Sequence, residues 1–365
     1  MVSPAGAASR AEVRALLSLD ATPGIGLVRL RQIVDTFGSA ERALAAPTRE
    51  FEAVAGASAT RGRGDAAVSE QVNSALAEAD RLGMEVCTWT SADYPQALLH
   101  LHDPPPVLFL RGRRDLLGRA AVTVVGSRRA TTRARDVAER LGQVLARAGV
   151  TVVSGVALGV DGATHRGTLA AGGDTIAVLG RGADAAYPVA HRGLFRDIVA
   201  KGLVVSEFMP GTPPLAHHFP RRNRILAALA QAVVVVEAGA TSGSLITVDH
   251  ALDLGIEVWA VPGPIEVASC EGSNRLLTDG ARPLVSIAGF VQAFTGVSAE
   301  ITPQMELVPG PAGRLLSGLG SETLGIDQLA AKAGLPVAET LALLTEMELG
   351  GWVLQMPGMR FRRAA

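Results

Sequence analysis

Short apolar runs alternate with amphipathic stretches through the middle of the chain, from Ala121 to about Val285. The apolar runs are AVTVVGS, VTVVSG, DTIAVLG, LVVSEF, AVVVVEAG and EVWAVPG. Nearly continuous runs of β-branched residues are typical of parallel strands buried on both faces. The stretches between them, which include RDVAERLGQVLARAG, HRGLFRDIVAKG, RILAALAQ and SLITVDHALDLG, have helical spacing. The alternation predicts an α/β domain with a doubly wound, Rossmann-like parallel sheet.

The N-terminal part has the spacing of short helices. Residues 11–50 contain AEVRALLSLD, GLVRLRQIVDTFG and SAERALAA, and a helix from about Val68 to Leu82 leads into the strand EVCTW. The turn from Pro23 to Gly26 is either a helix-hairpin-helix whose N–H groups hold a phosphate, or only a sharp turn. Residues 56–65, GASATRGRGD, are expected to form an exposed loop. We expect residues 1–82 to form a small helical domain, of helix-hairpin-helix or SAM-like type.

The C-terminal part has the pattern of a winged helix. Residues 296–312 are rich in proline and glycine and are expected to be a linker. After them come AGRLLSGLG, IDQLAAKAGL and VAETLALLTEMELGG, and then WVLQMPGMRFRR, which predicts a hairpin turning at Pro357-Gly358. We therefore expect a Rossmann-like domain over residues 83–295, a linker over 296–312 and a winged-helix domain over 313–365.

The third helix of the predicted winged helix carries three glutamates and neither lysine nor arginine. Such a helix would be repelled by a groove lined with phosphates, so we expect that this domain is not a major DNA reader. Its apolar residues follow helical spacing and are expected to face the domain core. They are Val337, Leu341, Leu344 and Met347.

Composition narrows the class of protein. Hydrophobic residues make up 48% of the 365 residues, and the longest apolar runs, such as Val233–Val236, are far shorter than a membrane span. The two cysteines, Cys87 and Cys270, indicate no disulfide framework, so the cytoplasm is the expected compartment. The N-terminus lacks the pattern of a signal peptide. The net charge of −1 does not indicate a nucleic-acid partner, and the abundance of arginine over lysine is also what a coding bias produces.

Three predicted strands end in small or hydroxyl residues followed by a helix. In an open α/β sheet, ligands bind beyond the carboxyl ends of the strands, where helix N-termini present free N–H groups. The sequence therefore predicts an anion-binding rim at this edge. Its residues are Gly126, Ser127, Arg128, Arg129, Ser154, Gly155, Ser242, Gly243 and Ser244.

Clustered arginines suggest that the bound anion is a polymer. Arg222 and Arg224 flank Asn223 in a predicted loop-to-helix step, and several cationic points along one edge suit a run of phosphates. If Asn223 turns inward to brace the loop, the two arginines point to different sides. Bases of a single strand need stacking partners. The candidates, which are otherwise core or surface residues, are Phe219, Phe195, Tyr187 and His191.

Other chemistries lack their motifs. NAD binding would require a Gly-x-Gly-x-x-Gly turn after the first strand and an acidic residue at the end of the second. The first strand instead ends in GSRRAT, with one glycine, and no acidic residue follows Ser154-Gly155. The sequence also has no Gly-Lys-Ser/Thr loop of the kind that binds nucleotide phosphates. The adjacent His217 and His218 have no cysteine near them, so no metal and no cofactor are expected. Asp161 and His165 have i, i+4 spacing but no evident nucleophile beside them. Glu207 is expected to hold a neighbouring arginine or a loop amide.

From Tyr94 to Pro283 the chain resembles the DNA-processing protein A family (DprA, also called Smf). The matching pieces, in order, are YPQALLHLHDPPPVLFLRG, VTVVGSR, VVSGVALGVDGATH, DTIAVLGRGADAAYP, VVSEFMPG, HHFPRRNRI, VVVEAGATSGSLITVDHAL, VWAVPGP and GSNRLLTDGA. The resemblance implies a protein that binds and protects single-stranded DNA and helps load the RecA recombinase in natural transformation. It also implies a homodimer formed through the Rossmann-like domain, and no catalysis.

By motif position, the resemblance makes Arg128 the phosphate-binding arginine and places Ser127, Arg222, Asn223 and Arg224 in motifs that line the DNA groove. Val189 departs from the pattern, because many relatives have a basic residue directly after the Tyr-Pro turn; Arg192 is a possible substitute. The alternative is a Rossmann-like nucleoside-monophosphate phosphoribohydrolase, which needs a catalytic carboxylate beside a Gly-Gly-x-Gly-Thr turn. Here the turn is GATSGSLITVDHA, and the nearest acid is Asp249.

Overall fold

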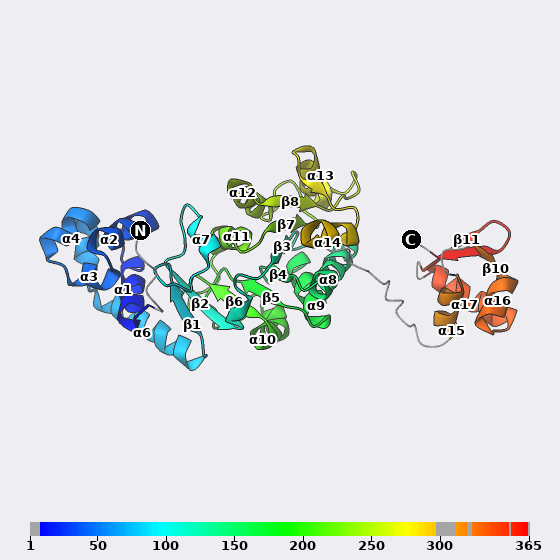
Figure 1. Ribbon diagram of the computed structural model, residues 1–365, viewed down its shortest axis with the longest axis horizontal. Coiled ribbons are helices and arrows are strands. Elements are labelled where there is room, and N and C mark those ends of the chain that lie inside the picture. Colours follow the sequence, from blue (N-terminus) through cyan, green and yellow to red (C-terminus); the bar gives the residue numbers. More distant parts are fainter. Residues whose placement is uncertain (1–7, 297–310, 320–322, 350–351, 364–365) are drawn as a thin grey trace. The chain divides into compact units, whose positions relative to one another are not determined.

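The computed structural model describes residues 8–296, 311–319, 323–349 and 352–363 (Figure 1). The chain divides into two compact units, Met1–Ala299 and Glu300–Ala365, which are described separately. Among the described residues, no helix is long and apolar enough to cross a membrane.

The first unit is built on a nine-stranded sheet in the order β1-β2-β6-β5-β4-β3-β7-β8-β9. Strands β3 to β9 are mutually parallel, whereas β2 pairs antiparallel with both β6 and β1. The predicted Rossmann-like parallel sheet is therefore confirmed. The strands are β1 (Glu85–Thr88), β2 (Val107–Gly112), β3 (Ala121–Val125), β4 (Thr151–Ser154), β5 (Thr175–Val178), β6 (Leu203–Ser206), β7 (Ala232–Val235), β8 (Glu257–Ala260) and β9 (Arg282–Pro283).

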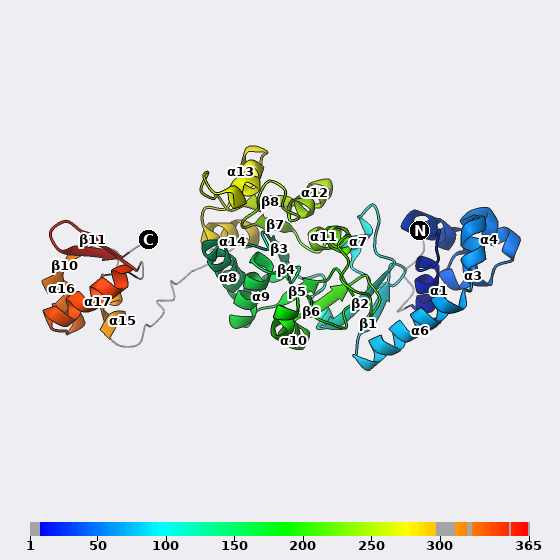
Figure 2. The same ribbon diagram turned by 180° about the vertical axis from the view of Figure 1, so that it is seen from behind.

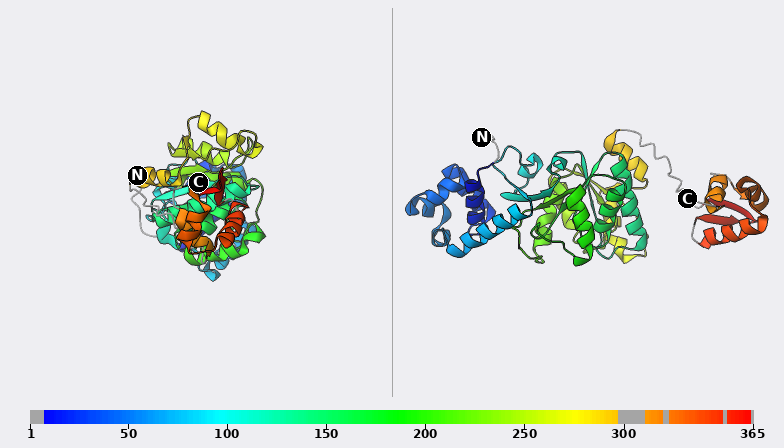
Figure 3. Two further views of the ribbon diagram at one scale, coloured as in Figure 1. Left: turned by 90° about the vertical axis from the view of Figure 1, so that its right-hand side faces the viewer. Right: turned by 90° about the horizontal axis from the view of Figure 1, so that it is seen from below.

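Helices cover both faces of this sheet. The chain runs from β3 outward to β6 and then returns to the other side of β3 to form β7, so right-handed crossovers place the two sets of helices on opposite faces (Figure 2). One set is α8 (Thr132–Arg147), α9 (Val160–Ala170) and α10 (Arg192–Lys201), which lie side by side (Figure 3, right). The other set includes α11 (His218–Ala228) and α12 (Leu245–Asp253), which pack against each other. Beyond these lie the short α7 (Gln96–Leu99) and, after β8, α13 (Glu271–Thr278) and α14 (Ile287–Thr295).

The order of the strands reverses at β3, because the chain builds β4 on one side of it and β7 on the other. The loops that follow β3 and β7 diverge above this point. Ligands of open α/β sheets bind in such a crevice.

The N-terminal helices share an apolar core with the sheet, in which Leu16 and Phe51 cluster with Phe109 of β2 and Val204 of β6. The predicted loop over residues 56–65 is wrong, because a helix forms there around the fully buried Ala59. The helices are α1 (Arg10–Asp20), α2 (Leu27–Phe37), α3 (Ala40–Ala45), α4 (Thr48–Ala55), α5 (Ala57–Gly62) and α6 (Ala66–Arg81).

The second unit is a winged helix with a small apolar core that includes Leu329 and Phe361. Leu344 and Met347 are buried as predicted, but Val337 and Leu341 are 46% and 38% exposed. That part of the prediction is wrong, because the buried face of the third helix passes through Thr340, which is fully buried, instead of Leu341. Its elements are α15 (Pro311–Leu319), β10 (Leu324–Gly325), α16 (Ile326–Ala333), α17 (Val337–Leu349), β11 (Val353–Met356) and β12 (Arg360–Arg363). Residues 297–310 of the predicted linker lie outside the described residues.

Candidate nucleic-acid interface

A cavity of about 1080 Å³ opens at the carboxyl edge of the sheet, where the strand order reverses. The loop after β3 contributes residues from Val125 to Arg129, and the loop after β7 contributes residues from Gly239 to Ser244. Helix α11 forms a wall with Phe219, Arg222 and Asn223. The structure thus brings the predicted strand ends after β3 and β7 to one cavity, whereas Ser154 and Gly155 after β4 lie outside its lining and only Ala157 and Asp161 beyond them reach it.

Arg128 presents its charge to this cavity. Its side chain is exposed, and its guanidinium carbon lies 4.9 Å from the centre of the Phe219 ring. The Tyr187 ring packs against the same Phe219 ring, with centres 5.6 Å apart and planes tilted by 37°. Among the described residues, Arg128 forms no ion pair, so its N–H donors are available to a ligand. Gly126 makes the turn possible, because a Cβ there would lie 2.7 Å from Val160 Cγ2 and 2.9 Å from the Glu237 carbonyl oxygen.

The strand end after β4 differs from the prediction. The Ser154 hydroxyl is fully buried and donates to the Val124 carbonyl oxygen at 2.7 Å. The Asp161 carboxylate accepts from the N–H groups of Gly155 and Ala157 at 3.2 and 3.3 Å. A carboxylate of the chain itself therefore occupies the position expected for a bound anion. Burial raises the pKa of Asp161, whereas the charge of Arg222 lowers it.

Sequence reasoning missed this role of Asp161. The available signal was an acidic residue in the first turn of a helix that follows a Ser-Gly strand end, since such residues favour helix N-termini.

A second carboxylate occupies the start of α8. Glu237 accepts from the Thr131 N–H at 3.2 Å and from the Thr131 hydroxyl at 2.6 Å. Among the described residues no carboxylate caps the start of α12, and the N-cap residue Ser244 makes no side-chain capping bond; the Leu245 and Thr247 N–H groups donate to the carbonyl oxygens of Ser242 and Ser244 at 3.0 and 3.1 Å. The hydroxyls of Ser242 and Ser244, 2.8 Å apart, lie beside these N–H groups. The position left for an external anion is therefore between Arg128 and the start of α12.

The predicted loop-to-helix step at Arg222–Arg224 is wrong. Helix α11 already begins at His218, and Pro220 fits its first turn, where a backbone N–H has no helical partner. All three side chains are buried: Arg222 is 4%, Asn223 7% and Arg224 2% exposed.

Arg222 and Asn223 connect the loops that form the cavity. Arg222 donates to the carbonyl oxygens of Gly155, at 3.0 Å, and of Val178. Asn223 donates to the Gly243 carbonyl oxygen at 3.0 Å and accepts from Arg222 Nε at 3.3 Å. Burial lowers the pKa of Arg222 to about 10. The two side chains thus fix the loops after β4, β5 and β7 relative to one another.

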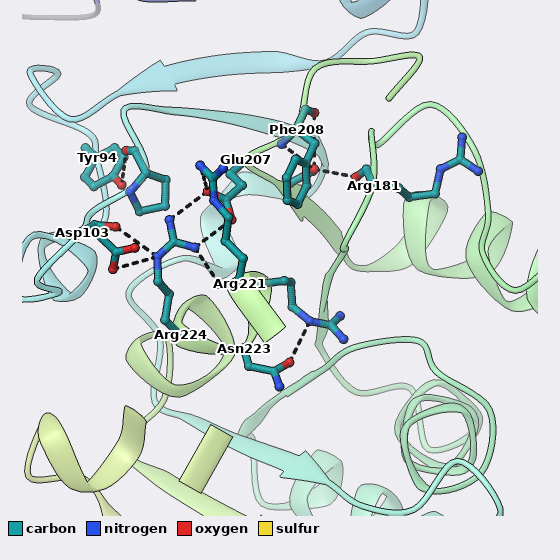
Figure 4. Close-up of polar contacts among 11 residues, drawn as sticks. Tyr94, Asp103, Arg181, Glu207, Phe208, Arg221, Asn223 and Arg224 are labelled. Carbon is teal, nitrogen blue, oxygen red and sulfur yellow. Dashed lines mark hydrogen bonds and ion pairs between the residues drawn. The ribbon is translucent and has the colours of Figure 1, made fainter. Parts of the chain in front are cut away.

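Arg224 points to the other side of α11, into a buried ion-pair network (Figure 4). Its two terminal nitrogens donate to the two oxygens of Glu207 at 2.7 and 2.8 Å, and Nε donates to the Asp103 carbonyl oxygen at 3.0 Å. Arg221 also pairs with Glu207, at 2.9 Å. The prediction that Glu207 holds a neighbouring arginine is confirmed, and Asn223 does separate Arg222 and Arg224 to different sides.

The remaining candidates divide between core and surface. Phe195 and His191 are buried outside the cavity, and the His191 imidazole lies 3.0 Å from the Val156 carbonyl oxygen. Arg192 is exposed at the start of α10 and does not line the cavity. His165 hydrogen-bonds Thr175 instead of Asp161, and burial lowers its pKa to about 3.

Two further chemistries find little support in the described part of the chain. It contains no group of three or more His, Cys, Asp or Glu that could hold a metal ion. Asp249, the acid of the hydrolase alternative, is exposed and does not line the cavity.

Comparison with known proteins agrees with this architecture. Residues 85–295 match the family profile described as DNA recombination-mediator protein A, and residues 302–359 match that of the DprA winged helix domain. Protein Smf of Escherichia coli K12 is 38% identical over 283 residues, which cover 74% of this chain and 76% of the relative. The DNA processing protein DprA of Streptococcus pneumoniae R6 is 42% identical over 193 residues, which cover 53% of this chain and 68% of the relative.

Two solved structures are similar. That of DNA processing protein A from Streptococcus pneumoniae has a TM-score of 0.65 and 31% identity, and covers 79% of this chain and 98% of its own. That of DNA processing protein A from Helicobacter pylori, described for its single-stranded DNA binding mode, has a TM-score of 0.53 and 29% identity, and covers 55% of this chain and 93% of its own. The chain therefore belongs to the DNA recombination-mediator protein A family.

Proposed function

We propose that this protein binds single-stranded DNA in the cavity at the carboxyl edge of the sheet. One observation carries the proposal: the exposed Arg128 and the start of α12, which no carboxylate caps among the described residues, line the same cavity, while two other anion positions are filled by the carboxylates of Asp161 and Glu237. A phosphate held there would place a neighbouring base beside Tyr187 and Phe219, since aromatic side chains stack bases without regard to sequence.

The predicted site residues have two roles in this proposal. Those that contact the strand are Ser127, Arg128, Arg129, Ser242, Gly243 and Ser244, with Arg192 as an outlying phosphate contact. Those that shape the site are Gly126, Ser154, Gly155, Arg222, Asn223 and Arg224. The description of the Helicobacter pylori relative, which names single-stranded DNA, supports this ligand.

We further propose that the protein acts in the cytoplasm as a homodimer formed through its Rossmann-like domain. In this role it protects single strands and helps to load the RecA recombinase on them, as a binding protein and not as an enzyme. Family membership supports these steps. The assay for loading is the rate of RecA assembly on oligo-dT, which should rise when the protein is added.

The experiment that tests the ligand is a fluorescence anisotropy titration of labelled oligo-dT. Release of base from nucleoside monophosphates is measured in parallel on the same preparation. We expect saturable binding of oligo-dT and no release of base. Base release that depends on Asp249, with no binding of oligo-dT, would replace the proposal by the hydrolase alternative.

A further inference from the structure

Large apolar side chains are exposed on one side of the cavity and not on the other. The loops after β4, β5 and β6 carry four of them, Leu158, Tyr187, Val189 and Leu215, which are 46%, 39%, 66% and 43% exposed. The loops after β3 and β7 form the proposed phosphate position, and the structure describes all their residues; none of these is a large exposed apolar residue. We call the four residues the apolar rim.

The apolar rim borders the proposed phosphate position. Tyr187 lines the cavity, and Leu158 and Leu215 are each next in sequence to residues that line it. The loop that carries Leu158 packs directly on the turn after β3, because the Val160 N–H donates to the Ser127 carbonyl oxygen at 3.2 Å. A strand that leaves the phosphate position in this direction therefore meets the apolar rim at once.

The three loops that carry the rim form one continuous edge. Strands β4, β5 and β6 are neighbours in the sheet, so their carboxyl ends lie next to one another. The His191 imidazole, after β5, lies 3.0 Å from the Val156 carbonyl oxygen, after β4. The Gly182 N–H, also after β5, donates to the Thr212 carbonyl oxygen, after β6, at 3.2 Å. The rim thus extends from the cavity along the carboxyl edge toward β6.

Charge favours this direction for the strand over the opposite one. On the other side of the cavity, the exposed Glu271 at the start of α13 lines the wall and repels phosphates. The carboxylates closest in sequence to the rim, Asp161 and Asp184, instead accept backbone N–H groups of the protein. Arg192, beyond Val189 on the rim side, is exposed. The strand is therefore expected to pass over the rim and not over α13.

We propose that the apolar rim contacts the bases of the strand whose phosphate Arg128 anchors, and that this contact selects unpaired strands over duplex. The inference rests on the proposed function. Unpaired bases offer faces on which protein side chains pack, and such contacts do not depend on sequence. In a duplex the bases are stacked on one another and the phosphates face outward. A duplex therefore reaches Arg128 but not the rim.

The experiment compares three labelled probes of equal length by fluorescence anisotropy with the full-length protein. They are oligo-dT, a strand with the same phosphates in which every residue is abasic, and a duplex. The wild type should bind oligo-dT at least tenfold more tightly than the abasic strand. In the double variant Leu158→Gln, Leu215→Gln, affinity for oligo-dT should fall at least fivefold, and affinity for the other two probes less than twofold. Val189→Gln changes the most exposed rim residue and so disturbs packing least; it should lose at least twofold on oligo-dT alone.

Leu252→Gln is the matched control, because Leu252 is 62% exposed on α12 and does not line the cavity. It should change each of the three affinities less than twofold. Wild-type affinity for oligo-dT in the folded rim variants, or equal losses on oligo-dT and the abasic strand, would overturn the inference and leave single-stranded DNA as the ligand. A wild type that does not bind oligo-dT would overturn the proposed function and this inference with it.

Discussion

Replacing Arg128 by alanine removes an exposed arginine that lines the cavity and forms no ion pair among the described residues. The guanidinium is exposed and packs only against the Phe219 ring, at 4.9 Å. Its loss therefore leaves no buried carboxylate unpaired, and the free energy of unfolding should change by less than about 0.5 kcal/mol. A change in DNA binding would then report the lost contact and not a damaged fold.

The expected loss follows from the strength of one charged contact. A hydrogen bond to a charged group contributes about 1.5–3 kcal/mol, which corresponds to roughly ten- to hundredfold in affinity. The release of one counterion fewer should also lower the salt dependence by about 0.7 log units per decade on single strands. Arg128→Lys should recover only part of the affinity, because a point charge cannot reproduce the planar fork of arginine.

The assay is anisotropy of labelled oligo-dT at several salt concentrations. Arg140→Ala is the matched control, because it removes an exposed arginine of α8 that does not line the cavity. We expect the control to change affinity less than about twofold at moderate salt, where separated exposed charges are screened. If an Arg128→Ala protein keeps its fold and matches Arg140→Ala in affinity and salt slope, the single-stranded DNA binds elsewhere on the protein.

Four further predictions test other parts of the chain. Arg224→Ala should lower the free energy of unfolding by about 3 kcal/mol, near the lower end for breaking a buried ion pair, because the buried Glu207 keeps only the partly exposed Arg221 as an ion-pair partner. Urea unfolding measures this, and the salt slope of DNA binding should not change. Asp20→Asn should stabilise the protein by about 1–2 kcal/mol at pH 7.5 but not at pH 4. Burial raises the pKa of Asp20 to about 6, so its stabilising contribution is complete below its ordinary pKa and is lost as pH rises through 6. Gly26→Ala should cost no more than about 1 kcal/mol of stability, because alanine is a poorer N-cap than glycine but φ is −91° and no atom lies within 4 Å of the added carbon; it should weaken duplex binding severalfold if the turn holds a phosphate. Deleting residues 313–365 should change single-strand affinity less than about tenfold, and a hundredfold loss in a folded protein would contradict this.

The sheet could be predicted because its signal is local. Each central strand is a short run of β-branched residues between glycine-rich turns, and a strand buried on both faces needs such a run. The helix over Ala57–Gly62 was missed for the opposite reason. The segment around it, residues 56–65, holds three glycines and two arginines, which is typical of a loop, and the helix forms because Ala59 packs into a core that distant residues build.

The site could be predicted only in part, because hydrogen bonding at a strand end depends on residues far away in sequence. The turn after β3 was expected to bind an anion, but Glu237, more than a hundred residues later, already occupies the start of α8. The same limit applies to Arg224, whose partners Glu207 and Asp103 come from other elements. A count of arginines therefore overstates the charge that the rim offers to a ligand.

This distribution of charge also bears on how strongly one protomer can hold a strand. Arg222 donates its hydrogen bonds to carbonyl oxygens inside the protein, and Arg224 pairs with the buried Glu207 carboxylate. The exposed arginines that line the cavity are therefore Arg128 and Arg129. A single phosphate contact of about 1.5–3 kcal/mol corresponds to no more than weak binding by itself. Useful affinity must therefore come from contacts repeated along the strand. When two linked sites bind one strand, binding at the first site raises the effective concentration of the strand at the second. The overall affinity then exceeds that of either site alone. A sparse anchor in each protomer therefore agrees with the proposed homodimer formed through the Rossmann-like domain.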